Sequence, residues 1–230
     1  RDSVSIKDFG AIGDGVARTV AEWIVPGTLA RFASFAALQV EYPFVTNTSW
    51  NLERAAIQAA FNASKKVHIP GGEYNLGTVS GGDTLIDLRP LGAGIAITTD
   101  GKAELVCQTT SNSQNSFFAL NANPTFYSDI IHFRDTGFIT NQADPKRGAT
   151  GFLVLTGSSS WGGLRFAGIY GKKIFSAFEI LNVGNTNEAT NRVSNIVIDD
   201  VTVDEGYYGV GLGANGDNVN IKKMTTSQVF

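Results

Sequence analysis

The chain has 230 residues, of which 43% are hydrophobic and 17% charged, and its formal net charge at pH 7 is −3. This composition belongs to a folded domain with enough residues for a sizeable core, and it excludes an acidic disordered tail. The weak negative charge offers no basic surface to a phosphate backbone, so we expect no nucleic-acid partner. No apolar run approaches the roughly 18 residues of a membrane span, and we expect no membrane insertion.

Glycine and cysteine usage narrows the class further. The 26 glycines against 6 prolines and 1 methionine favour β-structure with many tight turns. The one cysteine, Cys107, lies in the apolar run 103–107, which predicts a buried thiol that packs as a small hydrophobe. No disulfide can form within the chain, so durability must come from packing or oligomerisation.

The first 50 residues are predicted to hold one short strand and one helix. The strand covers residues 4–6 and leads into the turn-rich segment 8–15. In that segment Asp8 and Asp14 are interpreted as turn-forming side chains rather than ligands. Apolar residues at helical spacing predict a helix over 31–40, and Pro43 ends it.

Residues 51–64 give the strongest helix prediction in the chain. Ser49 or Asn51 can cap its N-terminus, and Glu53 lies in the first turn, where the helix dipole favours negative charge. Apolar residues form two stripes rather than one, so we expect the helix to be covered on more than one side.

From residue 66 onward the apolar pattern changes to period two. Short strand-like runs follow one another, at 67–74, 85–88, 95–97, 105–107, 117–120, 130–133 and 152–155. Many short strands separated by polar turns are compatible with a sandwich, a barrel or a solenoid.

A repeat favours the solenoid. Residues 195–203 align with 218–226 at an offset of 23 residues, and 164–170 form an earlier copy at an offset of 32, with the polar segment 184–191 as the excess. Each copy has apolar residues at alternating positions, then two turn residues, then apolar residues again. Such repeats predict stacked rungs of a parallel β-helix in which Ile198 and Ile221 are partners on adjacent strands.

The same register makes a prediction about charge. It stacks acidic residues of one rung beside lysines of a neighbouring rung, as Asp199 with Lys222, Asp200 with Lys223, Asp204 with Lys172 and Glu205 with Lys173. Each such pair contributes roughly 0.2–1 kcal/mol and avoids the repulsion of a same-sign ladder.

Three segments in a fixed order resemble a known family. They are VSIKDFGAIGDG at 4–15, AAIQAA at 55–60 and VHIPGGEY at 67–74. Together they resemble the entry of pectate-lyase-like right-handed parallel β-helices, where such a turn and helix cap the first rung. The long insertion 17–50 resembles phage tailspikes, and the motifs cover about the first third of the chain.

The resemblance implies an all-β right-handed parallel β-helix with N-terminal capping helices. Residues 1–65 would form a neck and capping-helix region, and 66–230 the first rungs of a β-helix that we expect to continue beyond Phe230. It also implies a homotrimer at the virion tail or otherwise extracellular, joined to other virion tail proteins through a preceding N-terminal part.

The function implied is binding and depolymerisation of a bacterial surface polysaccharide, either capsule or lipopolysaccharide, by a glycoside hydrolase without a cofactor. Two alternatives stay open: a polysaccharide lyase, and a receptor-binding or structural module without catalysis. A lyase would need a base and a cation to neutralise a uronate carboxylate, and its cation candidates are Lys172, Lys173, Lys222 and Lys223.

Hydrolysis needs two carboxyls, about 5–5.5 Å apart for retention of configuration or about 6.5–9.5 Å apart for inversion. Alternation turns Glu179 outward, opposite Gly211, which would leave room for a ligand. Asp204 and Glu205 are the next catalytic candidates, although lysine stacking also explains them.

The candidate sugar-binding residues are aromatic side chains at polar turns: Trp161, Tyr207 and Tyr208. The register places Tyr208 beside Ser176 as an outward pair. His68 and His132 have no second ligand at metal spacing, so no metal site is expected.

Overall fold

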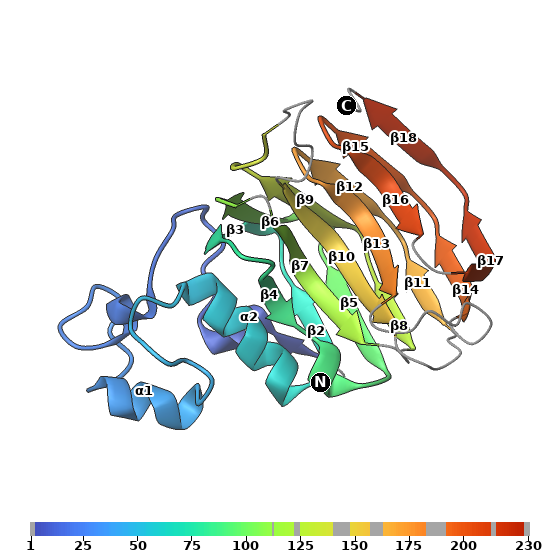
Figure 1. The fold of residues 1–230 in the computed structure, drawn as a ribbon. Helices are drawn as coiled ribbons and strands as arrows, with labels where there is room; N and C mark the ends of the chain where they lie inside the picture. Colours follow the sequence, from blue (N-terminus) through green and yellow to red (C-terminus); the bar gives the residue numbers. More distant parts are fainter. Residues whose placement is uncertain are drawn as a thin grey trace.

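The computed structural model describes residues 3–111, 113–121, 125–139, 148–156, 163–182, 192–212 and 215–227. Within these ranges the protein is predominantly β, with strands arranged in three parallel sheets and the helices confined to the N-terminal part (Figure 1). No helix in the described ranges is long and apolar enough to cross a membrane.

The first sheet has seven strands, and its order along the sheet follows the sequence. They are β1 (Val4–Ser5), β2 (Lys66–Ile69), β5 (Ile95–Thr99), β8 (Phe126–Ser128), β11 (Leu164–Phe166), β14 (Arg192–Ile198) and β17 (Asn215–Ile221).

The second sheet has six strands and the third has five. The six are β3 (Gly72–Val79), β6 (Ala103–Thr109), β9 (Ile131–Asp135), β12 (Ile169–Lys172), β15 (Val201–Asp204) and β18 (Met224–Ser227). The five are β4 (Thr84–Asp87), β7 (Gln114–Asn121), β10 (Gly148–Thr156), β13 (Ser176–Asn182) and β16 (Tyr208–Leu212).

The chain visits the three sheets in rotation. From β2 onward it passes from the seven-stranded to the six-stranded to the five-stranded sheet and back again, so each strand pairs with the third strand after it. Every pairing between these strands is parallel, which excludes an antiparallel sandwich or barrel. The predicted register is confirmed, because Ile198 pairs with Ile221 and Leu164 with Ile196.

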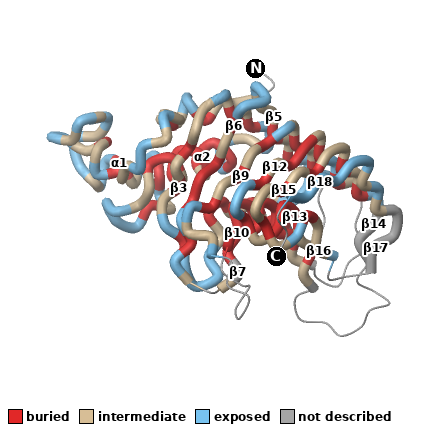
Figure 2. The backbone as a smooth tube through the Cα atoms, turned by 90° about the horizontal axis from the view of Figure 1, so that it is seen from above, coloured by how far each residue is buried: buried red, intermediate tan, exposed pale blue. Residues whose placement is uncertain are grey.

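Aromatic side chains fill the space between the sheets, where Figure 2 shows the backbone in the colour of buried residues. Phe118 stacks on Phe152 at a ring-centroid distance of 5.2 Å, because β7 and β10 place them in register. Phe166, from the seven-stranded sheet, lies 4.9 Å from Phe152 and 5.2 Å from Phe178. All four rings are fully buried, and each contributes roughly 1.5–3 kcal/mol by burial alone.

Helix α2 (Leu52–Ala63) lies across one end of the sheets and blocks the free edge of β4 (Figure 1). Arg54 donates from Nε to the carbonyl of Leu85 at 2.8 Å and from Nη2 to the carbonyl of Thr84 at 3.0 Å. The Gln58 amide pairs with both backbone groups of Asp87, at 2.8 and 3.1 Å. These side chains satisfy polar groups that would otherwise form an exposed sheet edge.

The helix was predicted over 51–64 with Ser49 or Asn51 as cap, and the structure selects Asn51, whose side chain accepts from the Arg54 N–H at 2.9 Å. Its buried face covers most of the helix, as the two apolar stripes predicted.

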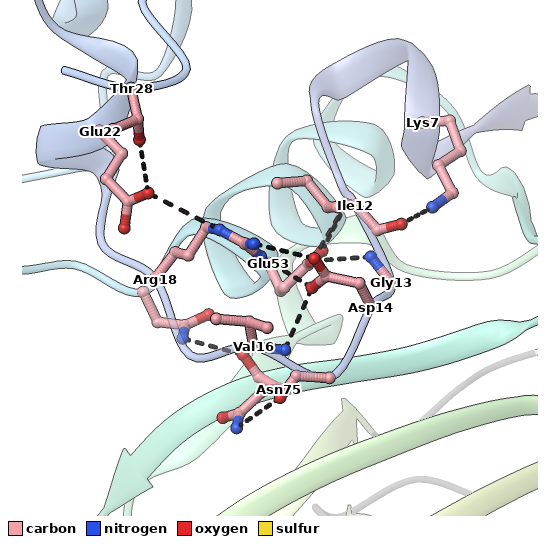
Figure 3. Close-up of polar contacts among 12 residues, drawn as sticks. Lys7, Ile12, Gly13, Asp14, Val16, Arg18, Glu22, Thr28, Glu53 and Asn75 are labelled. Carbon is pink, nitrogen blue, oxygen red and sulfur yellow. Dashed lines mark hydrogen bonds and ion pairs between the residues drawn. The ribbon is translucent and has the colours of Figure 1, made fainter.

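The turn before the helix is held by carboxylates (Figure 3). Glu53 of α2 accepts hydrogen bonds from the backbone N–H groups of Ile12 and Gly13, at 3.0 and 2.8 Å. Asp14 forms a two-bond ion pair with Arg18, which lowers the pKa of Asp14 to about 2. Asp8 accepts from the Ser5 N–H in a capping box. The turn-forming interpretation of both aspartates is therefore confirmed.

Three local predictions were wrong. Helix α1 (Phe35–Glu41) begins later than the predicted 31–40, because Phe32 donates its N–H to the Trp23 carbonyl at 2.8 Å and Ser34 caps the helix instead. The strand predicted at 4–6 ends at Ser5, where the short 3-10 helix η1 (Ile6–Phe9) begins. Strand β8 was not predicted at all, because three residues carry too little pattern.

Two further 3-10 helices complete the elements, η2 (Val20–Trp23) and η3 (Arg89–Leu91). The N-terminal region is continuous with the sheets: β1 pairs with β2 through Val4 and Val67, and one hydrophobic cluster extends from Ile6 to Val203. Cys107 is buried within this cluster, as predicted, and burial raises the pKa of its thiol well above the ordinary value.

Candidate functional site

The outer face of the six-stranded sheet carries aligned polar side chains. Strands β6, β9 and β12 alternate between buried residues and residues that reach the surface, as a one-sided sheet requires. The parallel register therefore forms rows across the strands. One row is Glu73, Glu104, His132, Tyr170, Thr202 and Thr225, and the next contains Arg134, Lys172, Asp204 and Ser227.

Arg134 joins two carboxylates in these rows. Its Nη2 lies 2.8 Å from Glu73 Oε1 and 3.2 Å from Glu104 Oε2. The two carboxylate oxygens are therefore at most 6.0 Å apart, the sum of these two contacts. This limit admits the separation of about 5–5.5 Å that glycosidases acting with retention use.

A surface cleft with a cavity volume of about 510 Å³ opens beside this group. It is lined by Glu104, Arg134, Thr136, Lys172 and Lys173. A volume of this size accommodates one or two sugar units. Three cations against one carboxylate in the lining make the cleft suitable for a sugar that carries an acidic group.

The two lysines of the cleft make the contacts that the repeat register predicted. Lys172 Nζ lies 3.7 Å from Asp204 Oδ2, and Lys173 Nζ lies 3.6 Å from Glu205 Oε2. Both lysine side chains remain about half exposed, and exposed pairs of this kind contribute only about 0–1 kcal/mol. A bound anion can therefore compete for either lysine at little energetic cost.

The corner that holds Lys173 and Glu205 has an unusual backbone. Both residues adopt left-handed φ angles, 53° and 56°, which non-glycine side chains seldom adopt. Each donates its N–H to the next strand, Lys173 to the Asp204 carbonyl at 2.9 Å and Glu205 to the Ser227 carbonyl at 3.0 Å. Residues at successive corners thus repeat the same strained conformation beside the cleft.

The other predicted charge pairs are also confirmed. Lys222 Nζ lies 2.6 Å from Asp199 Oδ1, and Lys223 Nζ lies 3.2 Å from Asp200 Oδ2. Arg165 also contacts Asp199, at 3.6 Å, so that a carboxylate lies between cations from two neighbouring strands. These pairs stabilise the strand stacking.

Glu179, the first catalytic candidate, lies on a different sheet from Asp204. It projects from β13 in the five-stranded sheet, where its Oε2 accepts hydrogen bonds from Thr150 at 3.2 Å and from Ser176 at 3.3 Å. Its pairing with Gly211 is confirmed. The expected room for a ligand is not found, because a Cβ placed on Gly211 would lie only 3.2 Å from Glu179 Cγ.

The tyrosine candidates pack together at the corner that follows β15. Tyr207 stacks on Phe175 with ring centroids 5.4 Å apart, and Tyr208 meets Tyr207 edge to face at 4.4 Å. Tyr208 is 46% exposed and pairs with Ser176 in register, but Ser176 is fully buried, so the expected outward pair is wrong in that half. Burial raises the pKa of Tyr208, with smaller contributions from Tyr207 and Glu179.

Trp161, the third predicted sugar-binding residue, lies outside the described residues. The structure thus brings Asp204 and Glu205 to the lysines of the cleft, and brings Tyr207 and Tyr208 to Phe175. It keeps Glu179 on a separate sheet from Asp204.

Sequence reasoning missed Glu73, Glu104, Arg134 and Thr136. Alternation within residues 130–133 could have placed Arg134 on the outer face, since buried Phe133 precedes it and buried Asp135 follows. His132, in the row beside it, stacks on Tyr170 at 4.9 Å. In the part of the chain that the structure describes, no group of three or more His, Cys, Asp or Glu side chains is placed to hold a metal ion.

No protein-family model, curated protein or solved structure matches the chain.

Proposed function

We propose that the chain forms a right-handed parallel β-helix of phage tailspike type, which binds and depolymerises a bacterial surface polysaccharide, either capsule or lipopolysaccharide. The rotation of the chain through three parallel sheets supports the β-helix, since each circuit then corresponds to one rung. The order of the turn, helix and strand segments supports the tailspike type.

The charged cleft on the six-stranded sheet is the observation that carries the functional proposal. It combines a carboxylate pair bridged by Arg134 with two lysines that exposed contacts hold weakly. Such a row lies along a regular sheet face, where a linear polymer can run across successive strands. Glycosidic hydrolysis would use a carboxyl pair of this separation, with one group protonating the leaving oxygen.

A polysaccharide lyase is the second candidate, and one further feature favours it. A lyase needs a base near a cation that neutralises the uronate carboxylate. His132 lies in the row next to Arg134 and Lys172 on the same face. The imidazole could accept the sugar proton while the cations hold the carboxylate.

The proposal also includes a homotrimer at the virion tail or in the extracellular space, attached to other tail proteins. Its grounds are the tailspike-like insertion and the single cysteine, which leaves packing and assembly as sources of durability. Light scattering of the full-length product should give the mass of three chains, and a stable monomer would contradict this part.

Product analysis separates the three functions. The protein is incubated with purified capsular polysaccharide and lipopolysaccharide from candidate hosts, and reducing ends and ultraviolet absorbance of unsaturated sugars are followed. Reducing ends without absorbance indicate hydrolysis, and both together indicate a lyase. Unchanged polymer that binds tightly would refute depolymerisation and leave a receptor-binding module.

Variants then locate the chemistry. Glu104→Gln should slow cleavage by at least about tenfold, whereas Asp199→Asn, which removes an ion-paired carboxylate away from the cleft, should leave the rate unchanged. Glu179→Gln, Asp204→Asn and Glu205→Gln test the remaining carboxylates in the same assay. If Glu179→Gln alone abolishes cleavage, the site belongs on the five-stranded sheet instead.

A further inference from the structure

A second pair of clefts lies far along the chain from the residues of the first, on either side of helix α2. One, with a cavity volume of about 420 Å³, lies between α2 and the segment from β4 to η3, and its lining includes Phe44, Trp50, Arg54, Gln58, Asp87 and Arg89. The other, of about 400 Å³, is lined in part by Asn47, Asn51 and Thr78. Trp50 and Arg54 belong to both linings, so they form the ridge between the two clefts.

Trp50 and Arg54 are stacked on each other. The guanidinium carbon of Arg54 lies 4.9 Å from the centroid of the indole ring, which places the cation over the aromatic face. Phe44 meets Trp50 edge to face at 5.7 Å. All three side chains are partly exposed, and they present an aromatic surface next to a positive charge.

The charge on Arg54 is held in place but is not compensated by an anion. Nε and Nη2 donate to backbone carbonyls of β4, which fixes the plane of the guanidinium. Among the described residues, no carboxylate lies within 4.0 Å of Arg54 and no hydrogen-bond acceptor is bound to Nη1. Burial lowers the pKa of Arg54, as expected for a cation that has lost water without gaining a counter-ion.

The other charged groups of the cleft already have partners. Arg89 binds both carboxylate oxygens of Asp87, at 2.7 and 2.8 Å. Gln58 is engaged with the backbone of β4. Arg54 is therefore the group in this lining from which an incoming anion gains most, since a charge-assisted hydrogen bond in a partly desolvated site is stronger than one in water.

We propose that this ridge is an accessory carbohydrate site that binds an acidic sugar unit, with the sugar carboxylate on Nη1 of Arg54 and the apolar face of the ring against Phe44 and Trp50. The inference rests on the proposed carbohydrate-directed function and deepens it by assigning an acidic polymer. The site lies on the N-terminal helix, whereas cleavage is assigned to the six-stranded sheet. It anchors the polymer and takes no part in bond breaking.

The test follows the indole resonance of Trp50 in the ¹⁵N-labelled full chain, assigned with Trp50→Phe. Oligogalacturonate, hyaluronan and polysialic acid oligomers are titrated, and fully methyl-esterified oligogalacturonate serves as the matched neutral probe. We expect a saturable shift of the Trp50 indole signal with at least one acidic oligomer. For oligogalacturonate the affinity should exceed that of its ester by at least about tenfold, or about 1.4 kcal/mol.

Arg54→Gln should weaken this binding about tenfold or more, Arg54→Lys should weaken it less, and Arg165→Gln, on the seven-stranded sheet, should leave it unchanged. Core amide resonances report whether each variant is folded, and the acid-to-ester comparison on the native chain decides the question if Arg54→Gln unfolds. Equal affinity for acid and ester, or no shift of the indole with any acidic oligomer, would overturn the site.

The two proposals fail separately. Shortening of the polymer without any shift of the Trp50 indole refutes the accessory site alone. A saturable shift without shortening supports the accessory site and refutes depolymerisation.

Discussion

Asp135 is the residue whose replacement tests the packing beside the cleft most sharply. Its carboxylate is fully buried at the end of β9, between Arg134 and Thr136 of the cleft. Oδ1 accepts from the N–H groups of Thr109 and Gly137, at 2.9 and 2.8 Å. Oδ2 accepts from the Thr109 hydroxyl at 2.6 Å and from the Ala149 N–H at 2.9 Å. One side chain thus joins the ends of β6, β9 and β10.

Asp135→Asn keeps the shape and removes one acceptor oxygen. The amide nitrogen is best placed toward Thr109, whose hydroxyl can rotate and accept, and this leaves the Ala149 N–H without an acceptor. An unsatisfied buried N–H costs about 1–3 kcal/mol, and loss of the charge weakens each of the two remaining bonds by about 1 kcal/mol. Easier burial of a neutral amide offsets part of this, so we expect a loss of about 2–4 kcal/mol in the free energy of unfolding.

Urea denaturation at neutral pH measures the effect, with Asp100→Asn as the control because the Asp100 side chain is 61% exposed. Asp135→Ala should cost more than Asp135→Asn, because all four donors lose their acceptor. The reasoning is refuted if Asp135→Asn is no more destabilising than Asp100→Asn.

Three further predictions concern the core and the N-terminal turn. Phe152→Ala should lower the free energy of unfolding by about 3–5 kcal/mol, because the buried ring contacts aromatic rings from all three sheets, and a loss below about 1 kcal/mol in urea would contradict this packing. Arg18→Gln should raise the pKa of Asp14 from about 2 toward 3.8, measured by carboxyl NMR titration, and the stability that this pair adds above pH 3.8, lost as pH falls toward 2, should disappear. Burial raises the pKa of Glu53 above 4.5, so the folded state binds its proton more tightly and the unfolding free energy should fall as pH rises above 4.5. Glu53→Gln should flatten that slope in thermal melts, and an unchanged slope would assign it to another group.

Local patterns predicted the register of the late strands but not the composition of the cleft. Ile198 and Ile221 could be paired because both copies have the same apolar spacing and few residues between them. The strands of the cleft have no such fixed period. Glu104 pairs with His132 after 28 residues, and His132 with Tyr170 after 38, because the connecting segments differ in length. No alignment within one sequence could therefore bring Glu104 and Arg134 together.

Other misses have local physical causes. Phe32 fits the helical pattern of its neighbours, but its backbone pairs with Trp23 in a tertiary contact that periodicity does not report. The spacing that turned Ser176 outward assumed a regular alternation along β13. In the structure Ala177 and Phe178 are both buried in succession, so the alternation is interrupted there.

The rate at which an acidic bacterial polysaccharide is shortened tests the functional account most directly, when it is compared among the native protein, Arg134→Gln and Arg165→Gln. Both arginines form ion pairs between neighbouring strands, but only Arg134 lines the cleft. We predict that Arg134→Gln slows shortening by at least about tenfold and that Arg165→Gln does not change it. Equal rates for the two variants, or no shortening by the native protein, would contradict the assignment of the cleft.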